Sequence, residues 1–502
     1  RFNVWTALTL ILLALFLAFV IYPIGMLLIK SLFTDGKVDL SYFVKFFTKK
    51  YYWGSLVNSF KVTVVSTLVA ALIGVPMAYM LRSVRIPGSG FINILIVISY
   101  LSPPFIGAYS WIQLLGRNGF FTKILNSLLG VKLNGIYGFA GIVLVFSLQS
   151  FPLIYMYVSG AMKNLDNSLN EAAESLGCNV FQRVTKIIFP LVMPSLLAGS
   201  LLVFMRVFSD FGTPMIIGEG YKTFPVMLYT QFMGEVGTND GFAATMCLIV
   251  IVIALMFFFI QQLLGRKFSY SMTALKPMEA ALPQITVLVT SFIGTINGSL
   301  FTGEFTLDNY RNIFAKGNTV AITNSYLFGL TAIVIVVVCG ILISYLSVRK
   351  RSALTSILDV LTMFPYIIPG SVLGISFLYA FNGPPFLLGG TALIIIISLS
   401  IRRMPYTIRS STAIIGQISP SIEEASISLG ASQMKTFLQV TIPMMLPGVL
   451  SGAIMSWITL ISELSSSVIL YTSKTMTLTV AIYSEVIRSN FGNAAAYSTI
   501  LT

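Results

Sequence analysis

Long apolar runs, separated by short polar stretches, make up most of the chain. Most runs reach the length of about 20 residues that a helix needs to cross a bilayer, and they end at charged residues or at Gly/Pro clusters. The predicted spans lie at residues 5–29, 57–81, 91–115, 137–160, 192–212, 242–264, 282–298, 322–346, 355–380, 388–410 and 447–470, with an incomplete one from about 493. The pattern predicts an all-α polytopic membrane protein.

The composition supports this fold class. Of the 502 residues, 56% are hydrophobic and only 10% are charged. Average soluble chains carry about 25% charged residues, so a soluble enzyme and a disordered or fibrous protein are excluded. The net charge of +14 comes from basic residues scattered through the loops. That distribution favours membrane lipids with anionic headgroups, and not nucleic acid, as the partner of the basic residues.

The residue types that usually carry catalysis or bind metals are scarce. The chain has no His, which excludes imidazole catalysis and every His-containing metal site. Its three cysteines, Cys178, Cys247 and Cys339, lie far apart and match no metal-ligand or disulfide spacing. We therefore expect no catalytic residue, no metal site and no cofactor in this chain.

The sequence repeats itself at a nearly constant offset. Residues 171–177 (EAAESLG) match residues 424–430 (EASISLG) at an offset of 253. The same offset relates Pro190 to Pro443 and Asp210 to Glu463, whereas Asn58-Ser59 matches Asn324-Ser325 at an offset of 266. The repeat predicts two homologous six-helix halves, residues 1–270 and 271–502. Repeated halves in membrane proteins commonly place a pathway at their interface.

The two copies of the repeated segment lie near residues 166–190 and 419–443, each between predicted spans. Asp, Asn and Ser before the first copy suit the start of a short helix, and Gly177 and Gly430 allow a sharp exit from it. Pro190 and Pro443 suit the start of the following helix. Each copy resembles the EAA loop of the permeases of ABC importers, and two copies at one offset make this resemblance specific.

The resemblance implies a type I importer fold and a division of labour between subunits. In that family the loop is a coupling helix that docks on a cytoplasmic ATPase. The implied ATPase-coupling residues are Glu171, Ala172, Ala173, Gly177, Glu424, Ala425 and Gly430. The chain contains no G-x-x-x-x-G-K-[ST] loop, so ATP and Mg would be bound by two copies of a separate ATPase. The implied location is the bacterial cytoplasmic (inner) membrane.

The resemblance also bears on the cargo. Residues 209–214 (SDFGTP), 402–406 (RRMPY) and 477–483 (TLTVAIY) are similar to fused permeases of the ferric-iron type. Permeases for thiamine, 2-aminoethylphosphonate or polyamines are alternatives within the class. An extracytoplasmic solute-binding protein is the implied donor, and residues 51–53, 221–223 and 472–474 are predicted to face it. A secondary transporter or channel is the alternative from another class, and an intramembrane enzyme is a distant third.

Charged residues inside the predicted spans are candidates for the pathway or a gate, because burying charge in a bilayer is costly. Asp210 and Glu463 each follow the Pro that opens their helix by 20 residues, which predicts a position near the outer end. They either face each other as a gate or cap the ends of their helices. Arg206 lies one helical turn before Asp210, within reach of an ion pair.

Arg402 and Arg403 align with Gln149 and Ser150 of the first half, about two-thirds of the way across the tenth span. They are predicted to hold an anionic group, to pair with Glu463, or to extend to the cytoplasmic interface. Pro103-Pro104, Pro365 and Pro369 are expected to kink spans three and nine, or else to mark loop entries.

The repeat is shorter than expected at two places. The seventh span lacks the apolar length of its counterpart in the first half, and the last span meets the end of the chain at Thr502. These gaps predict that a segment near residues 272–281, and residues after Thr502, are missing from the sequence.

Overall fold

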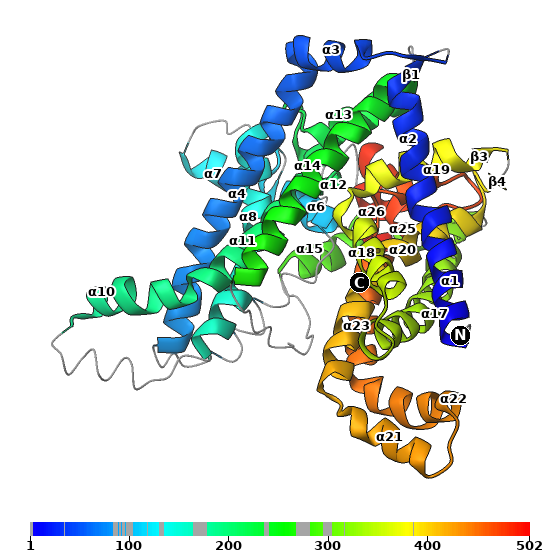
Figure 1. Ribbon diagram of the computed structural model, residues 1–502. Helices are drawn as coiled ribbons and strands as arrows, with labels where there is room; N and C mark the ends of the chain where they lie inside the picture. The colour runs from blue at the N-terminus through cyan, green and yellow to red at the C-terminus, as the bar shows by residue number, and fades with distance from the viewer. Residues whose placement is uncertain are drawn as a thin grey trace.

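The computed structural model describes residues 4–34, 36–83, 104–117, 119–129, 135–163, 178–234, 240–267, 282–294, 304–315, 317–384 and 386–502, together with residues 89, 92 and 96. Helices dominate these residues (Figure 1). The elements of the first predicted half are α1 (Val4–Phe16), η1 (Leu17–Ile21), α2 (Tyr22–Leu32), β1 (Phe33–Thr34), β2 (Lys37–Val38), α3 (Ser41–Thr48), α4 (Lys50–Ser83), α6 (Pro104–Leu115), α7 (Phe120–Leu129), α8 (Gly138–Lys163), α10 (Val180–Arg183), η2 (Val184–Ile188), α11 (Phe189–Ser209), α12 (Gly212–Ile217), α13 (Phe224–Met233) and α14 (Asp240–Lys267).

The second predicted half follows a similar order of elements. They are α15 (Leu282–Ser291), α16 (Asp308–Phe314), α17 (Val320–Arg349), α18 (Ala353–Ile367), α19 (Gly370–Phe381), β3 (Asn382–Gly383), β4 (Phe386–Leu387), α20 (Ala392–Gln417), α21 (Pro420–Ser428), α22 (Gln433–Thr436), η3 (Phe437–Thr441), α23 (Ile442–Ile461), α24 (Ser467–Leu470), α25 (Leu478–Ile487) and α26 (Phe491–Leu501). The strands form only two antiparallel hairpins, β1–β2 and β3–β4.

Among the described residues, seven helices are long and apolar enough to cross a membrane, and one bent pair of helices raises this to eight. The other predicted spans differ for identifiable reasons. Most of the part of span 91–115 that precedes Pro104 lies outside the described residues, and span 282–298 forms only the ten-residue α15. Helix α20 has 26 residues but carries Arg402, Arg403 and Arg409, which lower its hydropathy. The residues near 272–281 also lie outside the described part of the chain.

Span nine is broken, not merely kinked. Helices α18 and α19 meet at an angle of 110°. Ile368, which precedes Pro369, adopts an extended conformation (φ −71°, ψ 129°), and the residue before a proline is disfavoured in the α-helical region. Pro365 lies inside α18, before the break. In span three, Pro104 is the first residue of α6.

Equivalent residues of the two halves make equivalent contacts. Ser59 accepts a hydrogen bond from the Phe224 backbone at 2.7 Å, and Ser325 accepts one from the Leu478 backbone at 2.6 Å. The neighbouring Asn58 and Asn324 donate to backbone carbonyls of the same two loops. In each half a long helix packs on two others: α4 on α8 and α11, and α17 on α20 and α23. The matching contacts extend the sequence repeat to the three-dimensional arrangement.

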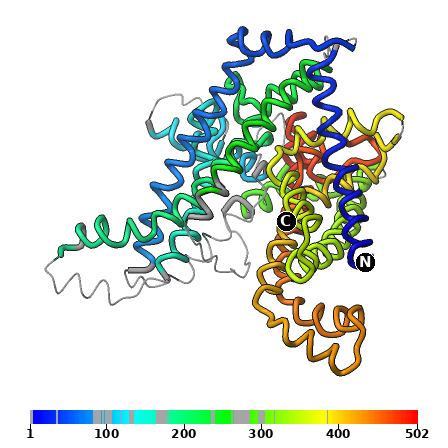
Figure 2. Tube along the Cα trace, in the orientation of Figure 1, coloured from blue at the N-terminus to red at the C-terminus, as the bar shows by residue number. Residues whose placement is uncertain are grey.

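Each predicted half sends an N-terminal helix to the other half. Helices α1 and α2 lie beside α18 and α19, whereas the rest of the first half, including α4, α8 and α11, lies on the other side of α14 (Figures 1 and 2). In the opposite direction, α15 packs on α6, and the Thr290 hydroxyl donates to Gln113 Oε1 at 3.0 Å. The two halves are therefore interlocked.

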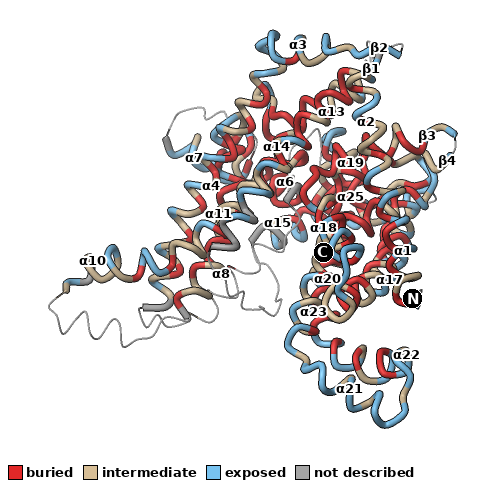
Figure 3. The backbone as a smooth tube through the Cα atoms, in the orientation of Figure 1, coloured by how far each residue is buried: buried red, intermediate tan, exposed pale blue. Residues whose placement is uncertain are grey.

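Buried residues are concentrated where the helices meet (Figure 3). Many of the exposed residues on the long helices are large and apolar. On α4, Val64, Leu68 and Leu72 are exposed at i, i+4 and i+8, so they form one stripe. The equivalent positions on α17, 266 residues later, are exposed and apolar too: Leu330, Val334 and Val338. Large exposed apolar stripes on long helices are typical of surfaces that contact lipid.

Candidate functional site

The second copy of the repeated loop forms a projecting helical hairpin. Helices α21 and α22 extend away from the bundle beyond the start of α23 (Figure 1). None of the residues of α21 is buried. Ser419 caps the helix by accepting a hydrogen bond from the Ser421 backbone, and Pro420 occupies its first turn. The local sequence thus starts the helix where the motif predicts.

Gly430 ends this helix in the way that the sequence predicts. Its φ of +91° lies in the left-handed region, which costs a residue with a Cβ about 1–2 kcal/mol. The turn satisfies carbonyls at the end of α21, because the amides of Leu429 and Ala431 donate to Ala425 and Ser426. The chain then enters α22, whose first turn is capped by Ser432.

Two adjacent glutamates in the hairpin take different positions. Glu424, the predicted coupling residue, is exposed, as is Ala425. Glu423 points to the bundle and pairs with Arg349 at 2.8 Å, and both side chains are nearly buried. Arg349 also donates to the Ile418 carbonyl at 2.6 Å. The pair joins the base of the hairpin to the end of α17.

A second anchor comes from the other end of the chain. The Trp5 indole of α1 donates to Gln433 Oε1 at 3.0 Å. Its ring packs 4.8 Å from Tyr345 and 5.3 Å from Phe437. Arg349, Glu423, Trp5 and Gln433 carry no motif that singles them out in the sequence, because their partners lie far away along the chain. The first copy of the motif, including Glu171, Ala172, Ala173 and Gly177, lies outside the described residues.

A short π-helical segment precedes each of the prolines Pro23, Pro190 and Pro443. Segments η2 and η3 end two residues before Pro190 and Pro443, and η1 ends two residues before Pro23. In each, the amide of the residue before the proline donates five residues back instead of four. Proline has no amide hydrogen and its ring collides with the carbonyl four residues earlier, so the wider π turn accommodates it. The helices thus begin before the prolines, earlier than the sequence predicts.

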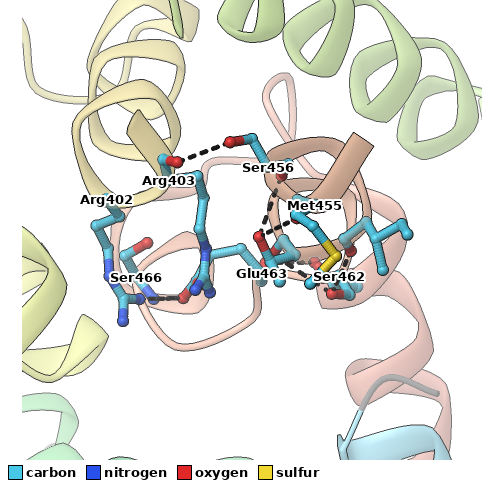
Figure 4. A network of polar contacts seen from close by, with 10 residues as sticks. Arg402, Arg403, Met455, Ser456, Ser462, Glu463 and Ser466 are labelled. Atoms are coloured by element: carbon cyan, nitrogen blue, oxygen red, sulfur yellow. Dashed lines mark hydrogen bonds and ion pairs between the residues drawn. The ribbon is translucent and has the colours of Figure 1, made fainter. Parts of the chain in front are cut away.

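The charged candidates of the second half converge on one buried carboxylate (Figure 4). Glu463, which follows α23, is 4% exposed and pairs with both Arg402 and Arg403 of α20. Its Oε1 also accepts the backbone N–H of Ser466 at 3.3 Å, and Thr479 donates to its carbonyl oxygen. Ser456 of α23 donates to the Arg403 carbonyl at 2.9 Å. Of the three alternatives predicted for the two arginines, the structure shows the pairing with Glu463.

The depth of this cluster differs from the expectation. Arg402 is the eleventh of the 26 residues of α20, so Glu463 lies near the middle of that helix and not at its outer end. The reason is that the helical run leading to α23 begins at Gln433, well before Pro443. Part of its length therefore lies in the projecting hairpin, and the residues counted from Pro443 reach less far across the bundle.

The first half has a weaker version of the same arrangement. Asp210 caps the end of α11, and its Oδ1 accepts the backbone N–H of Thr213 at 2.9 Å, as Glu463 accepts that of Ser466. Arg206 lies in the last turn of α11. The ring of Phe211, which follows Asp210, lies 6.1 Å from the ring of Tyr483 of the second half. The two halves therefore come into contact next to Asp210.

These features define a class: a polytopic helical membrane protein with two interlocked halves, polar groups at their interface, and an exposed hairpin on the second half. A family model described as "Binding-protein-dependent transport system inner membrane component" matches residues 70–270 and 337–502, one segment in each half. The chain belongs to this family. It is a multi-pass inner membrane protein and the non-catalytic transport subunit of a system that depends on a binding protein.

Relatives match the chain over almost its whole length. The ferric transport system permease protein FbpB of Actinobacillus pleuropneumoniae is 29% identical and is matched over 100% of this chain and 76% of its own. The putative ferric transport system permease protein FbpB 1 of Haemophilus influenzae is also 29% identical, over 95% of this chain and 79% of its own. Among solved structures, a bacterial ABC transporter involved in alginate import covers 52% of this chain and 95% of that chain, with 16% identity and a TM-score of 0.43.

Proposed function

We propose that this chain forms the translocation pathway of an ATP-driven importer for ferric iron. Two ATPase subunits in the cytoplasm would each dock on one of the two repeated loops, and a solute-binding protein would deliver the cargo on the opposite side. The two relatives described as ferric transport permeases support the choice of cargo. ATP and Mg would be bound by the ATPase subunits, since this chain carries no phosphate-binding loop.

The α21–α22 hairpin is the observation that carries the coupling role. It exposes a small apolar surface at its tip, where Leu429 is 90% exposed and Ile427 is 43% exposed. Ala425 and Gly430 next to it allow close approach of a partner surface. Its base is held rigidly by the Glu423–Arg349 pair and by Trp5, so a force on the tip is transmitted to α17 and α1.

The buried acids at the interface suit the pathway. Asp210 and Glu463 come from equivalent places in the two halves, and Phe211, next to Asp210, contacts Tyr483 of the second half. A relative movement of the halves would change the distance between the two acids, whereas Glu463 and its two arginines belong to the same half. We assign the interface between the halves as the route of the cargo, with Asp210, Glu463, Arg206, Arg402 and Arg403 along it.

Co-purification tests the coupling role. An affinity-tagged permease, expressed with the ATPase encoded beside it, is expected to retain the ATPase. Replacing Glu171 and Glu424 together by Ala should release it, whereas Glu304→Ala removes an exposed glutamate elsewhere and should not. Retention of the ATPase by the double variant would contradict docking at the two loops.

Uptake measurements test the cargo. Proteoliposomes holding the complete transporter, its ferric-binding protein and internal ATP should accumulate labelled ferric iron. Thiamine, 2-aminoethylphosphonate and polyamines should not compete. Uptake that proceeds without ATP, driven by an ion gradient, would favour the secondary-transporter alternative. ATP-dependent uptake of one of the three competitors in place of iron would contradict the ferric assignment alone.

A further inference from the structure

The cluster around Glu463 has more positive than negative charge. Two guanidinium groups face one carboxylate, which leaves an excess of one positive charge among side chains that are at most 17% exposed. Asp210, the equivalent acid of the first half, caps α11 one helical turn after a cation of its own, Arg206. An uncompensated charge inside a membrane protein is costly, and its presence commonly marks a functional site.

The start of α19 adds to this positive potential. A Cβ atom on Gly370, the first residue of α19, would collide with Arg402 Nη1. The guanidinium of Arg402 therefore rests directly on the N-terminus of a twelve-residue helix. A helix N-terminus carries a partial positive charge of roughly half a unit. The Arg402 guanidinium and the helix N-terminus repel each other unless an anion lies between or beside them. Glu463 offers only one negative charge for two arginines and this helix N-terminus.

Several polar groups in this region have no hydrogen-bond partner among the described residues. They include Nε of both Arg402 and Arg403. The hydroxyls of Ser371, in the first turn of α19, and of Ser466 and Ser467, beside Glu463, are also unpaired. All three serines are 1% exposed. Buried polar groups are normally paired, so unused donors next to an excess of positive charge suit the oxygen atoms of an anion.

The described residues of the first half offer no such site. Gln149 and Ser150 stand where the second half has Arg402 and Arg403. The N-terminus of α6, the counterpart of α19, faces the neutral Gln149, whose Nε2 would lie 2.6 Å from a Cβ built on Gly107. Among the described residues, the positive site is therefore a feature of the second half only.

We propose that Arg402, Arg403 and the N-terminus of α19 form a binding site for an oxyanion, a phosphate or carboxylate group, that Glu463 fills in this conformation. When the segment that carries Glu463 moves away from α20, the anion exchanges with the Glu463 side chain on the arginines. The inference rests on the proposed function only for the route by which the anion arrives, which is the pathway between the halves. The ligand that we propose is a free oxyanion, because the Arg402 and Glu463 side chains are almost fully buried.

Phosphate binding by purified variants tests the site. The permease with its ATPase subunits, in a maltoside detergent free of phosphate groups, is titrated with inorganic phosphate, and both binding and the thermal midpoint are measured. Glu463→Gln removes the internal anion and should bind phosphate at least tenfold more tightly than the natural protein. Its thermal midpoint should be lowered in chloride and restored by phosphate.

Two variants serve as controls. Glu463→Gln combined with Arg402→Gln should lose the response to phosphate at least tenfold. Asp308→Asn, which removes an exposed carboxylate paired with Arg311, should respond like the natural protein. If Glu463→Gln does not fold, Glu463→Asp withdraws the carboxylate by one methylene and should show an intermediate gain in phosphate affinity. A Glu463 variant insensitive to phosphate would overturn the proposal, as would an equal response in the double variant.

A further arm separates the two sources of the anion. Phosphatidylglycerol added without inorganic phosphate should not restore the thermal midpoint of Glu463→Gln, and restoration by the lipid alone would overturn the proposal. The binding assay contains no iron, so it is independent of the cargo. Phosphate binding without ferric uptake would contradict the proposed function but support the oxyanion site. Ferric uptake without phosphate binding would support the proposed function but contradict the oxyanion site.

Discussion

At the scale of single residues, neighbours in the sequence have different roles that only their contacts reveal. Glu423 and Glu424 are adjacent, but one is anchored to Arg349 and the other is exposed. In the same way, Gly430 has a φ of +91°, whereas Gly416, fourteen residues earlier, lies inside a helix with open space around it. Substituting each member of these pairs therefore distinguishes effects on stability from effects on coupling to the ATPase.

The two glutamates provide the first prediction. Glu423→Gln leaves Arg349 nearly buried without its counter-charge, which we expect to lower the free energy of unfolding by about 3 kcal/mol. Glu424→Gln should change that free energy by less than about 0.5 kcal/mol, as is usual for surface substitutions. Thermal unfolding of the purified permease measures the difference. Equal destabilisation by both variants would contradict the anchoring role of Glu423.

The glycines provide the second prediction. Gly430→Ala places a Cβ in a left-handed backbone conformation and should destabilise the hairpin by about 1–2 kcal/mol. The consequence should be a lower rate of transport-coupled ATP hydrolysis in the complete transporter. Gly416→Ala is the matched control, because Gly416 lies in the last turn of α20, has no positive φ, and has open space for a Cβ. A loss of coupling in Gly416→Ala as large as in Gly430→Ala would show that the turn is unimportant.

At the scale of elements, the π segment η3 determines the direction in which the α21–α22 hairpin projects from the bundle. Segment η3 joins α22 to α23 without a break, so the hairpin and the membrane helix rotate as one body. A π segment accommodates one more residue than an α-helix in the same length, and one residue corresponds to about 100° of rotation in a helix. The direction of the hairpin therefore depends on Pro443.

Pro443→Ala tests this dependence. Alanine supplies the missing amide hydrogen and removes the collision of the ring, so the segment should relax to a regular α-helix. We expect unchanged or increased thermal stability together with a loss of coupling between ATP hydrolysis and uptake. Cross-linking from a cysteine introduced at Leu429 to the ATPase should move to a different position. An unchanged cross-linking pattern with full coupling would contradict the proposed dependence.

At the scale of the whole molecule, the exchange of N-terminal helices joins the two halves. Trp5 of α1 packs on Tyr345 and Phe437, and Tyr109 of α6 donates to the Phe491 carbonyl at 2.6 Å. The contacts between the halves are thus aromatic, and they lie both at the exchanged helix α1 and between α6 and α26. We therefore expect the two halves to stay associated without a covalent link between them.

Separate expression of the halves tests this interlocking. Residues 1–267 and 282–502, produced together as two chains, should assemble and co-purify from detergent. Trp5→Ala removes a large buried aromatic side chain, which costs about 3–5 kcal/mol, and should reduce their association. Trp53→Ala, an exposed tryptophan within the first half, is the control. Failure of the unsubstituted halves to associate would show that the link between them is essential.

The sequence by itself determined the features that depend on local order and on repetition. The apolar periods placed the long helices, the fixed offset between EAAESLG and EASISLG identified two halves, and Gly430 ended its helix as its residue type requires. Each of these is set by interactions within a few residues, or by comparison of the chain with itself.

Only the tertiary structure decided which distant residues meet. Arg349 with Glu423, Trp5 with Gln433, and Glu463 with two arginines about 60 residues earlier are partners that no periodicity specifies. The repeat predicts which positions are equivalent, but it is silent on contacts between the halves. Such contacts depend on how the helices pack and cross, and a few prolines that widen or break a helix change that packing for every residue beyond them.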